Sequence, residues 1–110
     1  MAIDNSLYDS LESTYSKITD YFNKVQLGRE HSTMILKHEE LAELLEHLDI
    51  EAIEEQWSDI HALHKELEAI KEHSQKILED LNTIIDPAST ADNVVNELDN
   101  IFLKIARYHV

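Results

Sequence analysis

Apolar residues recur at heptad spacing over residues 50–85, a stretch that contains neither glycine nor proline. The seam consists of two series of positions three residues apart, namely Ile53, Ile60, Leu67, Ser74 and Leu81, and Gln56, Leu63, Ile70, Ile77 and Ile84. A continuous seam of this kind packs against other helices and does not by itself indicate a catalytic site. The pattern predicts one long helix over residues 50–85, which Pro87 ends because proline cannot continue the hydrogen-bond ladder.

Three further amphipathic segments predict helices over residues 6–27, 32–48 and 90–108. Gly28 ends the first helix, and Ser32 or Thr33 can cap the second. The apolar stripes are Leu7, Leu11, Ile18, Tyr21 and Val25 in the first helix and Ala91, Val94, Leu98, Ile101 and Ile105 in the last. Because the loop around Pro87 is short, we expect the last helix to run antiparallel to the long one.

The apolar face changes direction between Leu48 and Ile50. On one straight helix, the apolar residues before this point and those after it would lie on nearly opposite faces. The residues before it are Leu41, Leu45 and Leu48, and those after it are Ile50, Ile53 and Trp57. Asp49 is a favourable N-cap, and Leu48 and Ile53 have the spacing of a hydrophobic staple. These features favour a turn or sharp kink at residues 48–49. The alternative is one continuous helix over residues 31–85.

Together the patterns predict an all-α antiparallel bundle or coiled coil of three or four helices in a single domain. Composition agrees, because 110 residues with one Gly and one Pro leave few places for turns, and 43% apolar residues suffice for a core. The chain has no Cys, which excludes disulfides and thiolate sites. No apolar run of membrane-spanning length and no signal-peptide pattern is present, so we expect a cytoplasmic protein, with the nucleus as the alternative.

The formal net charge is −14 at pH 7, and it is concentrated in the middle of the chain. Nine acidic residues and no Lys or Arg lie between Lys37 and Lys65. A field of this sign repels phosphate backbones and acidic membranes, so we expect no direct binding of nucleic acid. It would attract a basic protein surface; the simpler interpretation is a solvated helix face.

Histidine is the residue type that most invites a chemical interpretation, with seven in the chain. The pairs His61 with His64 and His64 with Glu68 have the helical spacing of metal ligands. A di-iron bundle, however, repeats Glu-x-x-His on two helices, and no acid lies three positions before any histidine here. Residues 60–65 faintly resemble the active helix of histidine phosphotransfer domains, although Glu66 stands where that family has glycine. We predict no catalytic residue, no metal and no cofactor.

Residues 50–110 resemble the second and third helices of a spectrin-type repeat. The resemblance is carried by Leu63-His64-Lys65-Glu66-Leu67-Glu68-Ala69-Ile70, by His73, Ile77, Leu81-Asn82 and Ile84-Ile85, by the loop at Pro87-Ala88, and by Val94, Leu98, Ile101 and Ile105. Repeats of that family are three-helix antiparallel bundles that serve as spacers and docking surfaces, which is what the resemblance implies. The Trp usual in the family's first and last helices is missing, with Phe102 the nearest substitute, so we infer no cytoskeletal role.

These features predict a non-catalytic protein–protein interaction module, either an adaptor or a small subunit of a larger homo- or hetero-oligomeric assembly. Trp57 beside acidic residues has the anatomy of an interface hot spot, and the tyrosines of the first helix suit a half-exposed helix contact. The expected partner-binding residues are Ile50, Ile53, Trp57, Tyr8, Tyr15, Phe22, Glu54 and Glu55. The alternative is an acidic inhibitor or decoy that imitates the charge of nucleic acid on a basic protein target.

Overall fold

The computed structural model describes residues 6–83 and 86–106, and these fold into helices without any strand. The α-helices are α1 (Ser6–Lys24), α2 (Ser32–His47), α3 (Ile50–Gln56), α4 (Ile60–Asn82) and α5 (Pro87–Ala106), and a 3₁₀ helix, η1 (Arg29–His31), precedes α2. The prediction of an all-α bundle is confirmed. None of the helices within these ranges has the length and apolar content needed to cross a bilayer.

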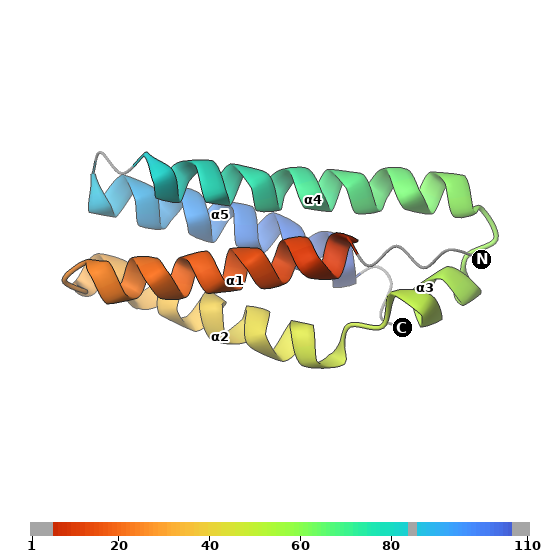
Figure 1. Cartoon of the computed structure of the whole chain (residues 1–110), viewed down its shortest axis with the longest axis horizontal. Helices are drawn as coiled ribbons and strands as arrows, with labels where there is room; N and C mark the ends of the chain where they lie inside the picture. The colour runs from red at the N-terminus through yellow and green to blue at the C-terminus, as the bar shows by residue number, and fades with distance from the viewer. Residues whose placement is uncertain (1–5, 84–85, 107–110) are drawn as a thin grey trace.

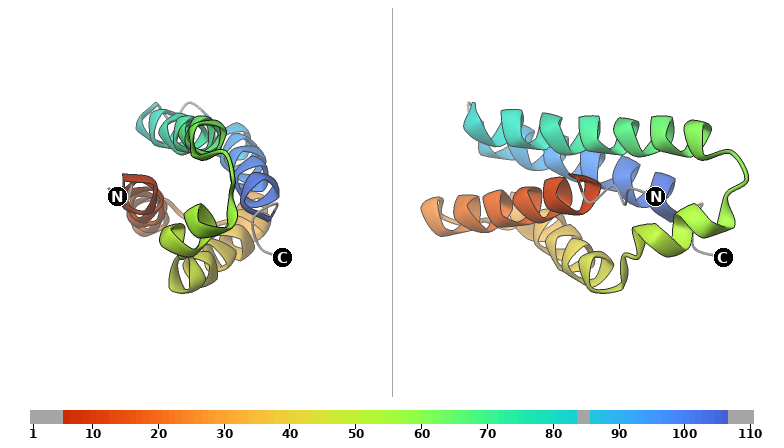
Figure 2. Two further views of the ribbon diagram at one scale, coloured as in Figure 1. Left: turned by 90° about the vertical axis from the view of Figure 1, so that its right-hand side faces the viewer. Right: turned by 45° about the vertical axis from the view of Figure 1, so that its right-hand side comes forward.

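Four of the helices form the bundle shown in Figure 1. The pairs α1–α2 and α4–α5 are antiparallel, and α1 packs against α4 while α2 packs against α5. The expected antiparallel course of the last helix is therefore confirmed. Viewed from the end, α2 and α4 lie on one diagonal of the bundle, and the chain crosses that end through α3 (Figure 2).

The core is built from the apolar stripes of the four long helices. Its fully buried large side chains are Leu7, Leu11 and Ile18 of α1, Met34 and Leu41 of α2, Leu63, Leu67, Ile70 and Ile77 of α4, and Leu98, Ile101 and Ile105 of α5. Burying one such side chain contributes about 1.5–3 kcal/mol. Since these residues are apolar at the period of a helix, the amphipathic pattern explains both the helices and the faces they bury.

The long helix predicted over residues 50–85 is wrong in one respect, because the chain leaves the helix after Gln56 and resumes it at Ile60. Asp59 has an extended backbone, and its carboxylate accepts a hydrogen bond from the backbone N–H of Ala62 at 3.0 Å. This N-cap replaces a continuous hydrogen-bond ladder. Gln56, a seam position in the sequence pattern, is exposed. The predicted end of that helix at residue 85 lies outside the described residues.

The break predicted at residues 48–49 is confirmed, and one continuous helix over residues 31–85 is excluded. The Asp49 carboxylate accepts a hydrogen bond from the backbone N–H of Ala52 at 3.1 Å and so caps α3. Leu48 is half-buried and Ile53 is buried, as a hydrophobic staple requires.

Other helix boundaries differ from the predicted ones by a few residues. The first helix ends at Lys24, before Gly28, and the second begins directly after the 3₁₀ turn, so that His31 occupies its N-cap position. The last helix begins at Pro87 and not near residue 90. Proline is favoured at the first helical position, because its missing N–H would have no partner inside the helix. Residues 107–110, where that helix was predicted to end, are outside the described ranges.

Candidate functional site

A groove of about 400 Å³ runs between α2 and α5 on the outer surface of the bundle. Its walls are Lys37 and Glu40 from α2 and Asp99, Phe102, Leu103 and Ala106 from α5. The apolar lining comes from α5, and carboxylates stand on both helices. The groove therefore offers an apolar strip between acidic edges.

Exposed leucines mark the same surface. Leu103 is 69% exposed and Leu36 is 59% exposed, whereas Leu27, after the end of α1, is 43% exposed. Leu36 lies one turn before Glu40, and residues four apart share a face of a helix. Leu36 and Leu103 thus stand on the two helices that form the groove. Burial of an exposed leucine is favourable by about 1.5–3 kcal/mol, so each is a potential anchor for a partner.

Lys37 is the basic residue of the groove, and carboxylates already surround its ammonium group. Its Nζ lies 2.8 Å from Asp99 Oδ1 and 3.4 Å from Glu40 Oε2, and 5.8 Å from the centre of the Phe102 ring. The hydrogen bond to Asp99 is the main reason that the pKa of Lys37 is raised above its ordinary value. With one lysine set against two acids, the groove retains a net negative charge.

Two of the aromatic residues of α1 that were expected to contact a partner, Tyr15 and Phe22, pack against α2. The ring of Tyr15 stacks on that of His38 with centroids 4.1 Å apart, and Phe22 meets the same imidazole edge-on at 5.2 Å. Tyr8, Tyr15 and Phe22 are all half-buried. Tyr15 and Phe22 therefore join the two helices of the α1–α2 hairpin, and part of each of the three rings remains accessible.

The expected contact residues around α3 divide into inward-facing and outward-facing groups. Ile53 and Glu54 are buried, Trp57 is half-buried against the core, and Glu55 is exposed. The side chain of Ile50 is outside what the structure describes. A partner that approaches this conformation would reach Glu55 and part of Trp57, but not Ile53 or Glu54.

A buried histidine, His31, lies at the turn between α1 and α2 and has hydrogen-bond partners for both ring nitrogens. The imidazole of His31 is fully buried, with Nδ1 accepting from the backbone N–H of Gly28 at 3.2 Å and Nε2 lying 2.8 Å from Tyr21 Oη. Since Nδ1 is an acceptor, Nε2 carries the proton of the neutral ring and donates to Tyr21. Burial, followed by the nearby charge of Glu30, raises the pKa of Tyr21. These contacts fix the turn between α1 and α2.

A second hollow, of about 410 Å³, lies at the turn between α4 and α5, and the residues around it are of polar types. It is lined by Asp80, Thr83, Asp86, Ser89, Thr90 and Asn93. The pKa of Asp80 is raised, chiefly by burial and then by the charges of Glu97 and Glu79. Within residues 6–83 and 86–106, no three His, Cys, Asp or Glu side chains gather in a way that could hold a metal ion.

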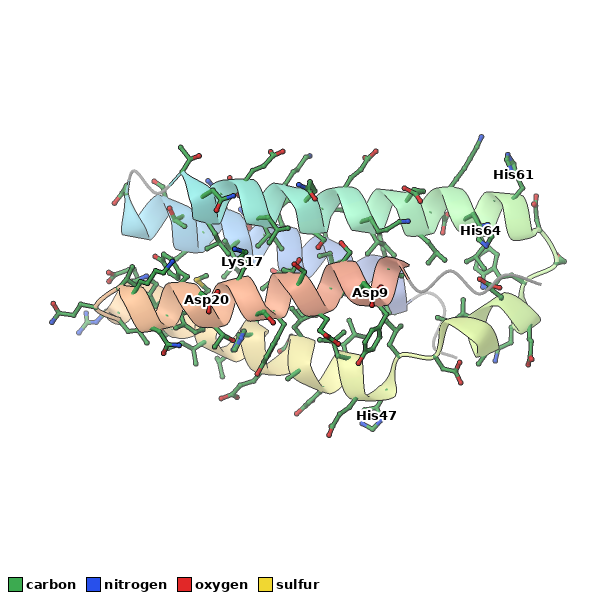
Figure 3. All side chains as sticks on the ribbon, in the orientation of Figure 1. Asp9, Lys17, Asp20, His47, His61 and His64 are labelled. Atoms are coloured by element: carbon green, nitrogen blue, oxygen red, sulfur yellow. The ribbon has the colours of Figure 1, made fainter. Side chains whose placement is uncertain are left out.

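His61 and His64, the pair with metal-ligand spacing, point in different directions. In Figure 3, His61 projects away from the bundle, whereas His64 points toward α3. There His64 Nε2 lies 3.4 Å from Oε1 of Glu54. The pair therefore does not share one coordination sphere, and His64 belongs to the contact between α4 and α3.

The sequence analysis missed Leu36 and Leu103, although a signal for both is present. Each is the last residue of an apolar triplet within a helix, residues 34–36 and 101–103. Three consecutive helical residues span about 200° around the axis, so they cannot all face one core. Comparisons of the chain with protein-family models, with curated proteins and with solved structures give no match.

Proposed function

We propose that this chain is a non-catalytic protein–protein interaction module, an adaptor or a subunit of a larger assembly, whose docking site is the α2–α5 groove. The observation that carries the proposal is the exposed Leu103 in a groove that Phe102 also lines and that Glu40 and Asp99 edge. The exposed Leu36 lies one turn before Glu40 on α2. Large exposed aliphatic side chains beside a groove are typical of a binding surface. The lack of cysteine suits a reducing compartment such as the cytoplasm.

The partner we propose is an amphipathic helix with basic residues beside its apolar stripe. A helix that docks in a groove inserts apolar side chains at intervals of three or four residues. Its Lys or Arg residues would pair with Glu40 and Asp99, because Lys37 does not neutralise both carboxylates. A second copy of this chain would bring its own surplus of acids to the contact, so charge favours a basic partner.

The test is the affinity for a fluorescently labelled synthetic helix with leucines at heptad spacing and lysines beside them, measured by fluorescence anisotropy. We expect Leu103→Asp to weaken binding by about tenfold or more, since losing one buried leucine costs more than the ~1.4 kcal/mol of a tenfold change. Leu27→Asp is the matched control, because Leu27 is also an exposed leucine but lies outside the groove. An equal effect of the two substitutions would contradict the proposal.

The acidic decoy remains a second candidate, favoured by the glutamates exposed along α2, which are Glu39, Glu40, Glu43 and Glu46. A decoy would bind a basic target through charge alone, so its affinity would fall steeply with added salt and would not depend on Leu103. Binding in the groove requires the leucine and retains an apolar component at high salt. Repeating the peptide titration at several salt concentrations separates the two candidates.

A further inference from the structure

The bundle consists of two helical hairpins that are joined by one crossing segment, residues 48–59. The first hairpin is α1 with α2, the second is α4 with α5, and α3 lies within the crossing segment (Figure 2). The hairpins bury their apolar stripes against each other, because α1 packs on α4 and α2 packs on α5. Each hairpin therefore needs the other one to cover its core face. The second hairpin of another copy of the chain would cover that face equally well.

The crossing segment has the sequence of a helix that continues into α4. It contains neither Gly nor Pro. The heptad seam keeps its seven-residue spacing across the non-helical residues 57–59, from Ile53 to Ile60 and from Gln56 to Leu63. A helix running from Ile50 to Asn82 would therefore keep these positions on one face, without a shift in register. The backbone can close the break by adding residues 57–59 to the helix.

The attachment of α3 in the single-chain fold is slight. This helix has seven residues, too few to be stable by itself, and it crosses one end of the bundle outside the four long helices (Figure 2). Ile53 and Glu54 are its buried side chains, and Trp57 after it is half-buried. If α3 instead continued α4 in a straight line, Ile50 would lie about 15 Å beyond the first residue of α4. The α1–α2 hairpin would then be carried away from the α4–α5 hairpin of the same chain.

We propose that the chain forms a domain-swapped dimer, in which α3 and α4 join as one helix and the α1–α2 hairpin of each copy packs on the α4–α5 hairpin of the other. The contacts between hairpins are those of the single chain, so the dimer needs no new core. The new contact lies between the two α3 segments, where Ile53 and Trp57 of both copies can be buried. The proposal does not rest on the α2–α5 groove being a docking site.

The charge of the crossing segment sets the conditions that favour the dimer. The segment holds five acids and no basic residue, namely Asp49, Glu51, Glu54, Glu55 and Asp59. The dimer brings two such segments together, and their repulsion favours the single-chain fold at low salt. We therefore expect the dimer fraction to rise with added salt, which screens the charges, and with protein concentration. Binding of a basic helix in the groove has the opposite dependence on salt.

The experiment is to unfold the protein in urea, refold it at low and at high protein concentration, and measure the mass by light scattering on a sizing column. We expect a dimer whose fraction rises with concentration. Asp59→Ala removes a cap that is used only in the single-chain fold. The loss of a cap changes stability about fivefold per chain, so the dimerisation constant should rise about thirtyfold. Asp49→Ala is the matched control, because the break that Asp49 caps remains in both forms.

Ser58→Pro should prevent the dimer. Proline inside a helix lacks the N–H of the ladder and clashes with the carbonyl four residues earlier, so α3 and α4 cannot join. The single-chain fold accommodates this proline, because it requires an extended residue before it, and Trp57 is extended, with φ −100° and ψ 129°. We expect this variant to stay monomeric, with the helical circular dichroism of the wild type, under conditions in which the wild type forms dimers.

A cross-link distinguishes an exchange of hairpins from association of intact bundles. Ser10 Oγ of α1 and Ser74 Oγ of α4 lie 3.0 Å apart, and the natural chain has no Cys. The variants Ser10→Cys and Ser74→Cys are mixed, unfolded and refolded together under oxidising conditions. A disulfide between the two variants is expected, and adding Ser58→Pro to both should abolish it. The proposal is overturned if Asp59→Ala stays monomeric at every concentration, if dimers form without this cross-link, or if Ser58→Pro dimerises like the wild type.

Discussion

At the scale of single residues, the hydroxyl groups between α1 and α4 show how a departure from the apolar seam is accommodated. Ser74 and Thr14 are fully buried, and their hydroxyls are hydrogen-bonded to each other. Ser10 Oγ donates to Ser74 Oγ at 3.0 Å, and Thr14 Oγ1 donates to the carbonyl of Ser10 at 2.9 Å. Ser74 interrupts the apolar heptad, but its hydroxyl forms a buried hydrogen bond with Thr14. A single sequence does not reveal this partner, because Thr14 lies on a different helix.

We predict that restoring the heptad with Ser74→Leu destabilises the protein. The larger side chain would overfill the contact and separate the hydroxyl of Thr14 from its partner, at a cost of about 1–3 kcal/mol. Urea denaturation followed by circular dichroism measures the change in the free energy of unfolding. Ser13→Ala, on the exposed side of α1, is the control and should change it by less than about 0.5 kcal/mol. An increase in stability for Ser74→Leu would contradict this account of the contact.

A second prediction concerns His38, which stacks on Tyr15. Burial lowers the pKa of His38 below its ordinary value, and a hydrogen bond to the carbonyl of Tyr15 partly opposes this effect. The unfolded chain therefore binds a proton here more readily than the native state does. As a result, stability falls as the pH drops through the ordinary histidine range, near 6.5.

His38→Phe should keep the ring contact with Tyr15 but remove the titrating group. We expect the free energy of unfolding to decline less between about pH 7 and about pH 5 in this variant than in the wild type. Urea denaturation at both pH values measures the difference. A steeper decline in His38→Phe would show that the stacked imidazole is stabilised by protonation, contrary to the burial that lowers its pKa.

At the scale of elements, the sequence shows where helices lie more reliably than where they stop. Residues 49–53 and 59–63 share the pattern Asp-Ile-x-Ala followed by an aliphatic residue, and both copies cap a helix in the same way. Only the first copy was interpreted as a helix start, because there the apolar face also changes direction. At the second copy the heptad seam continues through the break. A seam records which side chains are buried, but it does not show that the backbone between them is helical.

The two caps should differ in their effect on the whole molecule. Asp59→Ala removes the cap of a long core helix and should lower the free energy of unfolding by about 1 kcal/mol. Asp49→Ala removes the cap of α3, which lies outside the bundle, so it should increase hydrogen exchange in α3 with a smaller effect on global unfolding. Glu72→Ala, an exposed mid-helix change in α4, is the control. Equal global costs for the two caps would show that α3 is an integral part of the folding unit.

At the scale of the whole molecule, the amphipathic pattern was sufficient for the all-α bundle, since each stripe must be buried against another helix. It was not sufficient for the candidate groove, because a groove depends on which two helices become neighbours. Phe102 and Leu103 of α5 acquire their significance from Lys37 and Glu40 of α2, which are more than 60 residues away in the sequence. The expected partner residues were instead chosen from the stretch Ile50–Trp57 and from the aromatic stripe of the first helix. Tyr15, Phe22 and Ile53 largely turn inward, toward packing within the chain.

The net charge also acts at this scale. The chain carries a surplus of acids, and the glutamates on the outer face of α2 stand beside the groove. Such a surface accelerates encounters with a basic partner, while the leucines supply the contact that holds it. The charge affects the rate of association, and the leucines affect the stability of the complex. Added salt therefore tests the first feature, and a leucine substitution tests the second.

The most direct test of the central claim is to titrate isotope-labelled protein with the leucine–lysine helix and follow the backbone amide resonances by NMR. The account predicts shifts concentrated at residues 36–40 of α2 and 99–106 of α5, and little change along α1 and α4. Shifts spread over the acidic residues of the whole surface, or confined to helices other than α2 and α5, would contradict it.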